Sequence, residues 1–294
     1  METTRDGDRR RSVSSVISVI LPVRNGMPWL EHQLRALVDQ ECAEPWEVIV
    51  ADNGSTDDSP ALARQWADQH KRIRWVDGSA ITGAGAARNA GAEVAHGHQL
   101  AFCDADDIVQ PGWLASCSAA LERVDVVAGV YDFWSLNGLR ESAPSPASMR
   151  QLGFLPAGLG ANLAVRRSAF DAVGGFSVDL LIGEDVDLCW RLQLKGFRFD
   201  VEPGAVVAKR EPQEFKPAFL HAVAYGRCGP ALYRRFRDKG ARPYVIGAAK
   251  SWLWLVLFSP RLARPGSRRS EWARAAGMRI GRLLGSMREG VFFP

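Results

Sequence analysis

The stretch Leu100-Ala-Phe-Cys-Asp104-Ala-Asp106-Asp107 joins an apolar run directly to three carboxylates. We interpret Gln99–Cys103 as a buried strand, and open α/β sheets bind ligands beyond the carboxyl ends of their strands. Carboxylates placed there repel each other unless a cation lies between them. Mg²⁺ and Mn²⁺ are held by such groups together with substrate phosphates. A plain loop in which Asp107 caps the helix after Pro111 is the alternative interpretation.

Strand and helix signals alternate on both sides of this stretch. Apolar runs predict strands over 16–23, 46–51, 73–76, 99–103 and 124–133. Helices are predicted over 28–38, 59–70, 83–91 and 111–123. This rhythm predicts a mostly parallel sheet with helices on both faces, so that the polar loops after three of the strands gather at one edge.

The second half of the chain is less regular. We predict a mobile loop over 137–158, because this segment has several Pro, Ser and Gly residues and little periodicity. An amphipathic helix is predicted to begin at Glu184 and Asp185 and to continue to Lys195. Acidic residues in a first helical turn are favoured by the helix dipole, so simple capping is the alternative role for both.

Composition points to an ordinary globular protein of 294 residues, with 47% apolar residues and a net charge of +4. The five cysteines form no C-x-x-C pair and are expected to be reduced core residues. Residues 1–15 are polar, are expected to be disordered and lack the apolar core of a secretory signal. The run 16–23 is too short to span a membrane. These features predict a cytoplasmic protein.

Positive charge is concentrated near the C-terminus, where residues 261–288 hold eight arginines and the single acidic residue Glu271. The apolar run 245–258, which contains Trp252 and Trp254, is too short to span and is expected to be buried or interfacial. The following helix places one apolar stripe on a single face: Trp272, Ala276, Ile280, Leu283 and Met287. This pattern favours a helix lying on an anionic membrane, and equally one docked on protein. Nucleic acid is not expected, because no recognised binding motif accompanies the arginines.

Five segments occur in the order seen in family 2 glycosyltransferases, and the chain resembles the inverting members that have the GT-A fold. The segments are Val19-Ile-Leu-Pro22-Val-Arg-Asn25, Val50-Ala-Asp52-Asn-Gly-Ser-Thr-Asp57, Ala87-Arg88-Asn89-Ala-Gly91, Asp104-Ala-Asp106 and Gly183-Glu184-Asp185. The resemblance covers roughly residues 16–235. It implies an α/β, mostly parallel GT-A sheet over 16–240, with a donor half at 16–133 and an acceptor half at 134–240. A basic helical tail, at the membrane interface or packed on protein, would occupy 241–294.

The resemblance also implies an activity: transfer of one sugar from a nucleotide-diphosphate sugar to a hydroxyl acceptor, with Mn²⁺ or Mg²⁺. Asp106 and Asp104 would hold the metal, and Asp185 would be the general base, with Glu184 as the alternative. Substrate-binding roles are implied for Pro22, Asn25, Asp52, Arg88, Asp104 and Asn162. Arg166 belongs to the same stretch as Asn162. The expected acceptor is a lipid-linked saccharide or a cell-envelope glycan, reached from the inner face of the cytoplasmic membrane.

The chain departs from the family pattern in two places. Many relatives carry a histidine metal ligand after a later strand, whereas this sequence reads Val206-Val-Ala-Lys209-Arg210. Lys209 would then supply a fixed positive charge near the diphosphate, or metal binding is weak. His221 is expected to lie on a helix surface. The Gln-x-x-Arg-Trp motif and the membrane spans of processive relatives are also missing, which favours transfer of one sugar per encounter.

Three other functions share some features with this sequence. Gly83-Ala-Gly85 partly matches a dinucleotide fingerprint, but Arg88 stands at the third glycine and the motif does not follow the first strand. A nucleotidyltransferase would need a glycine-rich, basic loop after the first strand, which Pro22–Asn25 does not supply. An inactive relative that binds nucleotide sugar or a partner transferase is the second hypothesis.

Overall fold

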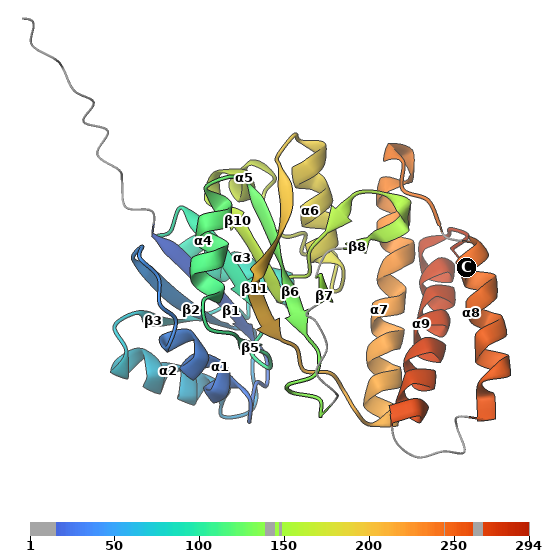
Figure 1. Cartoon of the computed structure of the whole chain (residues 1–294), viewed down its shortest axis with the longest axis horizontal. Coiled ribbons are helices and arrows are strands. Elements are labelled where there is room, and N and C mark those ends of the chain that lie inside the picture. The colour runs from blue at the N-terminus through green and yellow to red at the C-terminus, as the bar shows by residue number, and fades with distance from the viewer. Residues whose placement is uncertain (1–15, 139–144, 147–148, 244, 261–266, 294) are drawn as a thin grey trace, which may run out of the picture.

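The first four strands are parallel and form one side of a nine-stranded sheet (Figure 1). The computed structural model describes residues 16–138, 145–146, 149–243, 245–260 and 267–293. The strands are β1 Ile17–Val23, β2 Trp46–Asp52, β3 Ile73–Asp77, β4 Gln99–Cys103, β5 Ile108–Val109, β6 Val126–Asp132, β7 Ser145–Pro146, β8 Met149–Arg150, β9 Pro156–Ala157, β10 Asn162–Arg166 and β11 Phe199–Ala208. The helices are α1 Leu30–Val38, α2 Ser59–Gln69, α3 Ala84–Val94, α4 Trp113–Leu121, α5 Arg167–Ala172, α6 Glu184–Leu194, α7 Phe215–Phe236, α8 Val245–Leu257 and α9 Ser267–Glu289.

The order of the sheet is β3-β2-β1-β4-β10-β6-β11-β5. Strand β10 runs antiparallel to both β4 and β6, whereas β6 and β11 are parallel. The sheet is therefore mixed, although its first four strands are parallel as predicted. In this order β10 and β5 are reversed, whereas β1, β2, β3, β4, β6 and β11 are parallel, so the carboxyl ends of these six strands lie at one edge.

Helices cover both faces of the sheet, and the buried side chains form two clusters. The first cluster lies under α1, α2 and α4, and the second under α3, α5 and α6. The small-residue helix α3 packs closely on the sheet: a Cβ at Gly91 would lie 2.6 Å from Ile20 Cγ2. All five cysteines are free thiols, as predicted, and Cys103, Cys117 and Cys189 are buried.

The segment 137–158 is more ordered than predicted where the structure describes it. Strand β7 pairs with β6, and β8 pairs with β9. These strands have two residues each, so the periodicity on which strand prediction depends is absent. Residues 1–15, which were predicted to be disordered, lie outside the described residues.

Three helices, α7, α9 and α8, lie side by side at one end of the molecule (Figure 1). Leu232 and Phe236 anchor α7 in the second core cluster. Helix α9 packs along α7 through glycines: a Cβ at Gly281 would lie 2.2 Å from Val223 O, and one at Gly277 would lie 2.4 Å from Phe219 O. The backbones of these two helices therefore approach closely, and α9 is docked on protein over this face.

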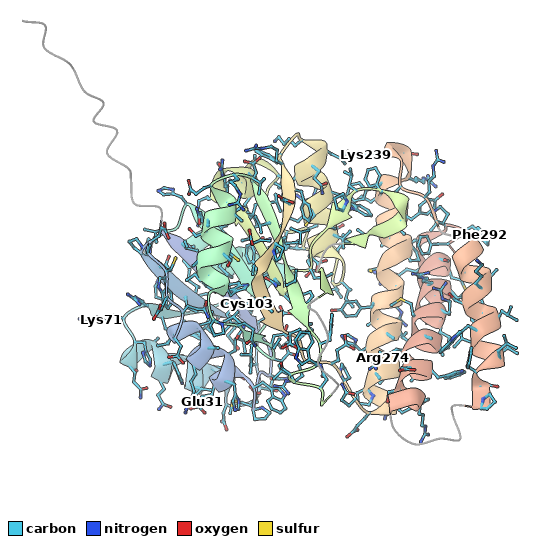
Figure 2. All side chains as sticks on the ribbon, viewed as in Figure 1. Glu31, Lys71, Cys103, Lys239, Arg274 and Phe292 are labelled. Atoms are coloured by element: carbon cyan, nitrogen blue, oxygen red, sulfur yellow. The ribbon has the colours of Figure 1, made fainter. Side chains whose placement is uncertain are left out.

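The apolar stripe predicted on α9 is divided by this packing. Ala276 is buried, and Trp272 Nε1 donates to Leu255 O of α8 at 3.1 Å. Ile280, Leu283 and Met287 remain exposed in the second half of the helix. Arg274 lies on the side of α9 near α7 (Figure 2), where its Nη1 donates to Pro212 O at 3.0 Å. None of the described helices is long and apolar enough to cross a membrane.

Candidate active site

A cavity of ≈ 580 Å³ opens at the sheet edge where β1, β4 and β11 end. Cys103, labelled in Figure 2, is the last residue of β4, and the carboxylates follow it directly. The segments that line the cavity include Pro22–Met27 at the end of β1 and in the loop after it, Asp104–Asp106 after β4, Gly183–Val186 at the start of α6, Lys209 after β11, and Tyr225 and Cys228 from α7. The topology thus gathers most of the predicted residues in one place.

Asp104, Asp106 and Asp107 form a cluster in which one carboxylate oxygen from each lies within 4.8 Å of the others. Asp106 is exposed, Asp104 is partly buried and Asp107 is buried. Although the residue is exposed, desolvation of its carboxyl group among its neighbours, together with the charge of Asp104, raises the pKa of Asp106. A set of crowded carboxylate oxygens is the kind of ligand that Mg²⁺ and Mn²⁺ prefer, so these residues fit a divalent cation.

Two basic side chains hold Asp104 from opposite sides. Arg88 Nη2 lies 2.8 Å from Asp104 Oδ1, and Lys209 Nζ lies 3.4 Å from Asp104 Oδ2. Burial opposes the charged carboxylate, but Lys209 and Arg88 outweigh it and lower the pKa of Asp104. Asp104 therefore stays ionised next to any cation bound by Asp106.

Lys209 also pairs with Asp107, whose Oδ2 lies 2.7 Å from Nζ. Burial raises the pKa of Asp107 to about 7, with Asp104 and Asp106 adding to the effect of burial and Lys209 opposing it. The lysine thus lies where the family resemblance led us to expect a histidine ligand, and it brings a positive charge into the acidic cluster.

Arg88 is a buried bridge between the sheet edge and α6. Its Nη1 lies 2.7 Å from Glu184 Oε1, while Nη2 contacts Asp104. The bridge requires a glycine at position 160, because a Cβ there would lie 2.7 Å from Arg88 Cζ. Arg88 is only 3% exposed, so its geometry favours positioning of the two carboxylates over direct contact with a ligand.

The structure separates the two adjacent carboxylates at the start of α6. Gly183 precedes them with φ +86°, a conformation that favours glycine. Glu184 is buried and paired with Arg88, and burial together with Asp185 raises the pKa of Glu184 to about 7. Asp185 is partly exposed at the cavity wall, and its Oδ2 accepts from the Gly160 N–H at 2.8 Å. Burial raises the pKa of Asp185, which makes it a stronger base.

Asp52 lies beside Pro22 and Asn25, which line the cavity, although Asp52 itself is not among the lining residues. Asp52 is paired in register with Val23, next to Pro22, and is 6% exposed. Its Oδ2 accepts from Ser55 N–H at 3.3 Å, whereas Oδ1 is buried and has no hydrogen-bond partner among the described residues. Burying a carboxylate oxygen without a hydrogen bond costs folding free energy unless a ligand donates a hydrogen bond to it. Asn25 Oδ1 accepts from Thr56 N–H at 2.8 Å, which joins the loops after β1 and β2.

Asn162 does not reach the cavity. Its side chain is fully buried and makes three hydrogen bonds: Oδ1 accepts from Trp113 Nε1 at 2.8 Å, and Nδ2 donates to Val130 O and Ala205 O. Every polar atom of its amide is thus used within the core, which argues against the substrate-binding role predicted for it. Arg166 lies at the opposite end of β10, where its Nε donates to Leu121 O.

Several cavity residues were missed by the sequence analysis. Asn53 holds the start of α3, because its Nδ2 donates to Gly78 O and its Oδ1 accepts from Gly83 N–H at 2.8 Å. Its place directly after Asp52 is a signal that could have identified it. Tyr225 and Cys228 come from the middle of α7, where no local motif marks them. His221 lies exposed on α7, as predicted, with its ring 4.4 Å from that of Tyr225.

Known proteins share this sequence pattern and this fold. The profile of Glycosyl transferase family 2 matches residues 18–177, and that of Glycosyl transferase family group 2 matches residues 100–257. Pre-mycofactocin glycosyltransferase from Mycobacterium tuberculosis is 31% identical over 262 residues, which cover 82% of this chain and 52% of that protein. The chain thus spans about half the length of that relative.

Two further proteins resemble the chain over more of their own length. Glycosyltransferase AglE from Haloferax volcanii is 32% identical over 248 residues, covering 82% of this chain and 74% of AglE. Mannosyltransferase PcManGT from Pyrobaculum calidifontis, solved in complex with GDP-Man and Mn²⁺, superimposes with a TM-score of 0.68. At 20% identity it covers 92% of this chain and 86% of its own, which identifies a shared fold.

Proposed function

The chain belongs to glycosyl transferase family 2, and from this premise we propose that it transfers one sugar from a nucleotide-diphosphate sugar to a hydroxyl acceptor. One observation carries the proposal. Asp104 and Asp106 of the acidic cluster line the same cavity as Asp185, although 79 residues or more separate them from it in sequence. The cavity can therefore hold a leaving diphosphate next to Asp104 and Asp106 and an attacking hydroxyl next to Asp185.

Asp106 and Asp104 would hold a divalent cation, Mn²⁺ or Mg²⁺, in this cavity. When bound, the cation supplies positive charge to the departing nucleoside diphosphate. Support comes from Asp106, whose exposed carboxylate is in no ion pair with the described part of the chain, and from PcManGT, which was solved with Mn²⁺. Asp104, held by Arg88 and Lys209, fixes the position of the cluster.

Asp185 would remove the proton of the acceptor hydroxyl as its oxygen attacks the anomeric carbon. The bond from that carbon to the diphosphate breaks in the same step, so a single displacement inverts its configuration. Glu184 is less suited to this role, because Arg88 already neutralises it. We assign Glu184 to positioning Arg88 at the start of α6.

The nucleoside would lie against Pro22 and Asn25, with the base donating to Asp52. The unpartnered, buried Oδ1 of Asp52 supports this assignment. PcManGT was solved with GDP-Man, which is a donor of the proposed class. The acceptor would enter past Leu181 and Tyr225, which are exposed apolar residues at the cavity wall. These residues suit an acceptor with an apolar part, and we propose a lipid-linked saccharide or cell-envelope glycan, reached at the inner face of the cytoplasmic membrane.

The proposal is tested by incubating the purified protein with a panel of labelled UDP-, GDP- and dTDP-sugars in the presence of Mn²⁺. Release of the nucleoside diphosphate from one class of donor is the expected result. Tight binding of a nucleotide sugar without any turnover, with or without a panel of saccharide acceptors, would instead favour an inactive relative that only binds the donor.

Lys209→Gln is expected to weaken binding of the nucleoside diphosphate by about tenfold in excess EDTA, because a charge-assisted contact to phosphate is lost. Isothermal titration calorimetry measures this affinity. Arg123→Gln is the matched control, since Arg123 is an exposed cation that pairs with Glu202 away from the cavity lining. Equal affinities of Lys209→Gln and wild-type protein would show that Lys209 serves only to neutralise Asp104 and Asp107.

A further inference from the structure

Helix α8 is the outermost of the three C-terminal helices (Figure 1), and it carries several exposed apolar side chains. Trp252, Leu253, Val256 and Leu257 form a surface that we call the apolar face of α8, and they are 38–70% exposed. Their spacing places them on one side of the helix, and no charged residue interrupts them. Soluble monomers seldom expose a continuous apolar surface of this kind without a partner.

A second cavity, of ≈ 380 Å³, lies between α8 and α9. Its lining combines two cations and a hydroxyl group with apolar side chains: Lys250, Ser251, Trp254, Ala275, Met278 and Arg279. We call it the α8–α9 pocket. Lys250 lines the pocket and is exposed, so the pocket opens to solvent on the helix that also carries the apolar face. Positive charge beside apolar walls suits an anionic group attached to a hydrocarbon chain.

Arg279 provides a second, independent sign of a missing ligand. Its Nη1 is buried and has no hydrogen-bond partner among the residues that the structure describes. Burial, with a smaller contribution from Arg282, lowers the pKa of Arg279 to about 10. A buried guanidinium N–H without an acceptor is costly, and a phosphate oxygen in the pocket would satisfy it.

The positive charge of residues 241–294 indicates which kind of partner could cover the apolar face of α8. Residues 241–294 contain ten Lys and Arg residues, and their acidic residues are Glu271 and Glu289. A second copy of the chain would bring like charges together across an interface. An anionic bilayer instead offers phosphate groups and hydrocarbon in adjacent layers, which matches the pocket and the apolar face.

We propose that the α8–α9 pocket binds the phosphate headgroup of an anionic membrane lipid while the apolar face of α8 enters the bilayer interface. The inference rests on the proposed function in one respect, since it places the cavity beside a membrane-borne acceptor. Arg279 and Lys250 contact the phosphate. Trp252 and Leu253 lie at the membrane interface, just below the lipid headgroups, where aromatic side chains are favoured.

Co-sedimentation of the full chain with vesicles tests the proposal without any turnover, so its failure leaves the proposed transferase activity untouched. Vesicles of phosphatidylglycerol and phosphatidylcholine are expected to bind the protein, and phosphatidylcholine alone is not. Arg279→Gln should weaken binding by more than about tenfold, which exceeds the roughly fivefold effect of one charge near an anionic surface. Arg279→Lys should recover part of the affinity.

Arg288→Gln is the matched control, because Arg288 is an exposed arginine on the same helix outside the pocket. Its effect should not exceed about fivefold. Thermal melting of each variant verifies that the fold is kept. Equal losses of vesicle affinity for Arg279→Gln and Arg288→Gln would contradict lipid binding in the α8–α9 pocket. They would indicate that only the overall positive charge attracts the membrane. A wild-type protein that binds no anionic vesicles at low salt, or that forms a dimer through Leu253 instead, would overturn the membrane site as a whole.

Discussion

Asp185→Asn is expected to lower kcat by about 10²–10⁴-fold, because the amide keeps the size of the side chain but cannot accept the proton of the acceptor hydroxyl. The affinity for the donor should be nearly unchanged, since Asp185 faces the acceptor side of the cavity in the proposed arrangement. Single-turnover measurements with a labelled donor give the rate, and calorimetry gives the donor affinity. Burial raises the pKa of Asp185, so the wild-type rate should fall on acidification at a higher pH than an ordinary aspartate would give.

Glu184→Gln is the matched comparison, because it removes the neighbouring carboxylate on the same helical turn. It breaks the ion pair with Arg88, and we expect a smaller loss of rate that is accompanied by lower thermal stability. An active Asp185→Asn together with an inactive Glu184→Gln would reverse the two roles. If both variants keep the wild-type rate, the two carboxylates only cap α6.

Asp106→Ala is expected to reduce transfer by at least about 10³-fold, because the cation that it would hold contributes several kcal/mol of charge stabilisation to the transition state. Removal of metal with EDTA should have the same effect on the wild-type protein, and added Mn²⁺ should restore activity. Electron paramagnetic resonance of Mn²⁺ provides a separate readout, in which Asp106→Ala should lose the bound-ion signal.

Asp68→Ala serves as the control for Asp106→Ala, since Asp68 is an exposed carboxylate on α2, away from the cavity lining. It should bind Mn²⁺ and turn over donor as the wild type does. Full transfer activity in excess EDTA would contradict the metal assignment, and Lys209 would then remain as the fixed charge beside the diphosphate.

The position of Asp104 and Asp106 at the sheet edge follows from the order of strands and helices in the sequence, whereas Arg88, Glu184 and Asp185 were grouped with them only by the family resemblance. The first four strands alternate with helices, so they are parallel and end at one edge, and the residues that follow them must meet there. The GT-A sheet was thus predictable where the alternation is regular. The roles of these residues stay predictions.

Other features could not be predicted because they depend on long-range packing. The reversal of β10 follows an irregular segment, and only the assembled sheet shows that Asn162 lies opposite Cys103 with its amide used in the core. On α9, a stripe of apolar residues does not reveal which neighbour covers it. The glycines of α9 allow it to pack closely on α7, which buries that side of the helix. Ala276 is buried, whereas Ile280 remains exposed. Tyr225 reaches the cavity through the docking of α7 as a whole.

A single displacement at one cavity inverts the anomeric carbon, and nuclear magnetic resonance of the anomeric centre tests this most directly. The product formed from a donor of known configuration, in the presence of Mn²⁺, is to be examined before any anomeric equilibration. We predict that the product of the wild type has the configuration opposite to that of the donor, and that Asp185→Asn forms little of this product. A product that retains the configuration of the donor would contradict the account, because retention requires either a second nucleophile or attack from the same face.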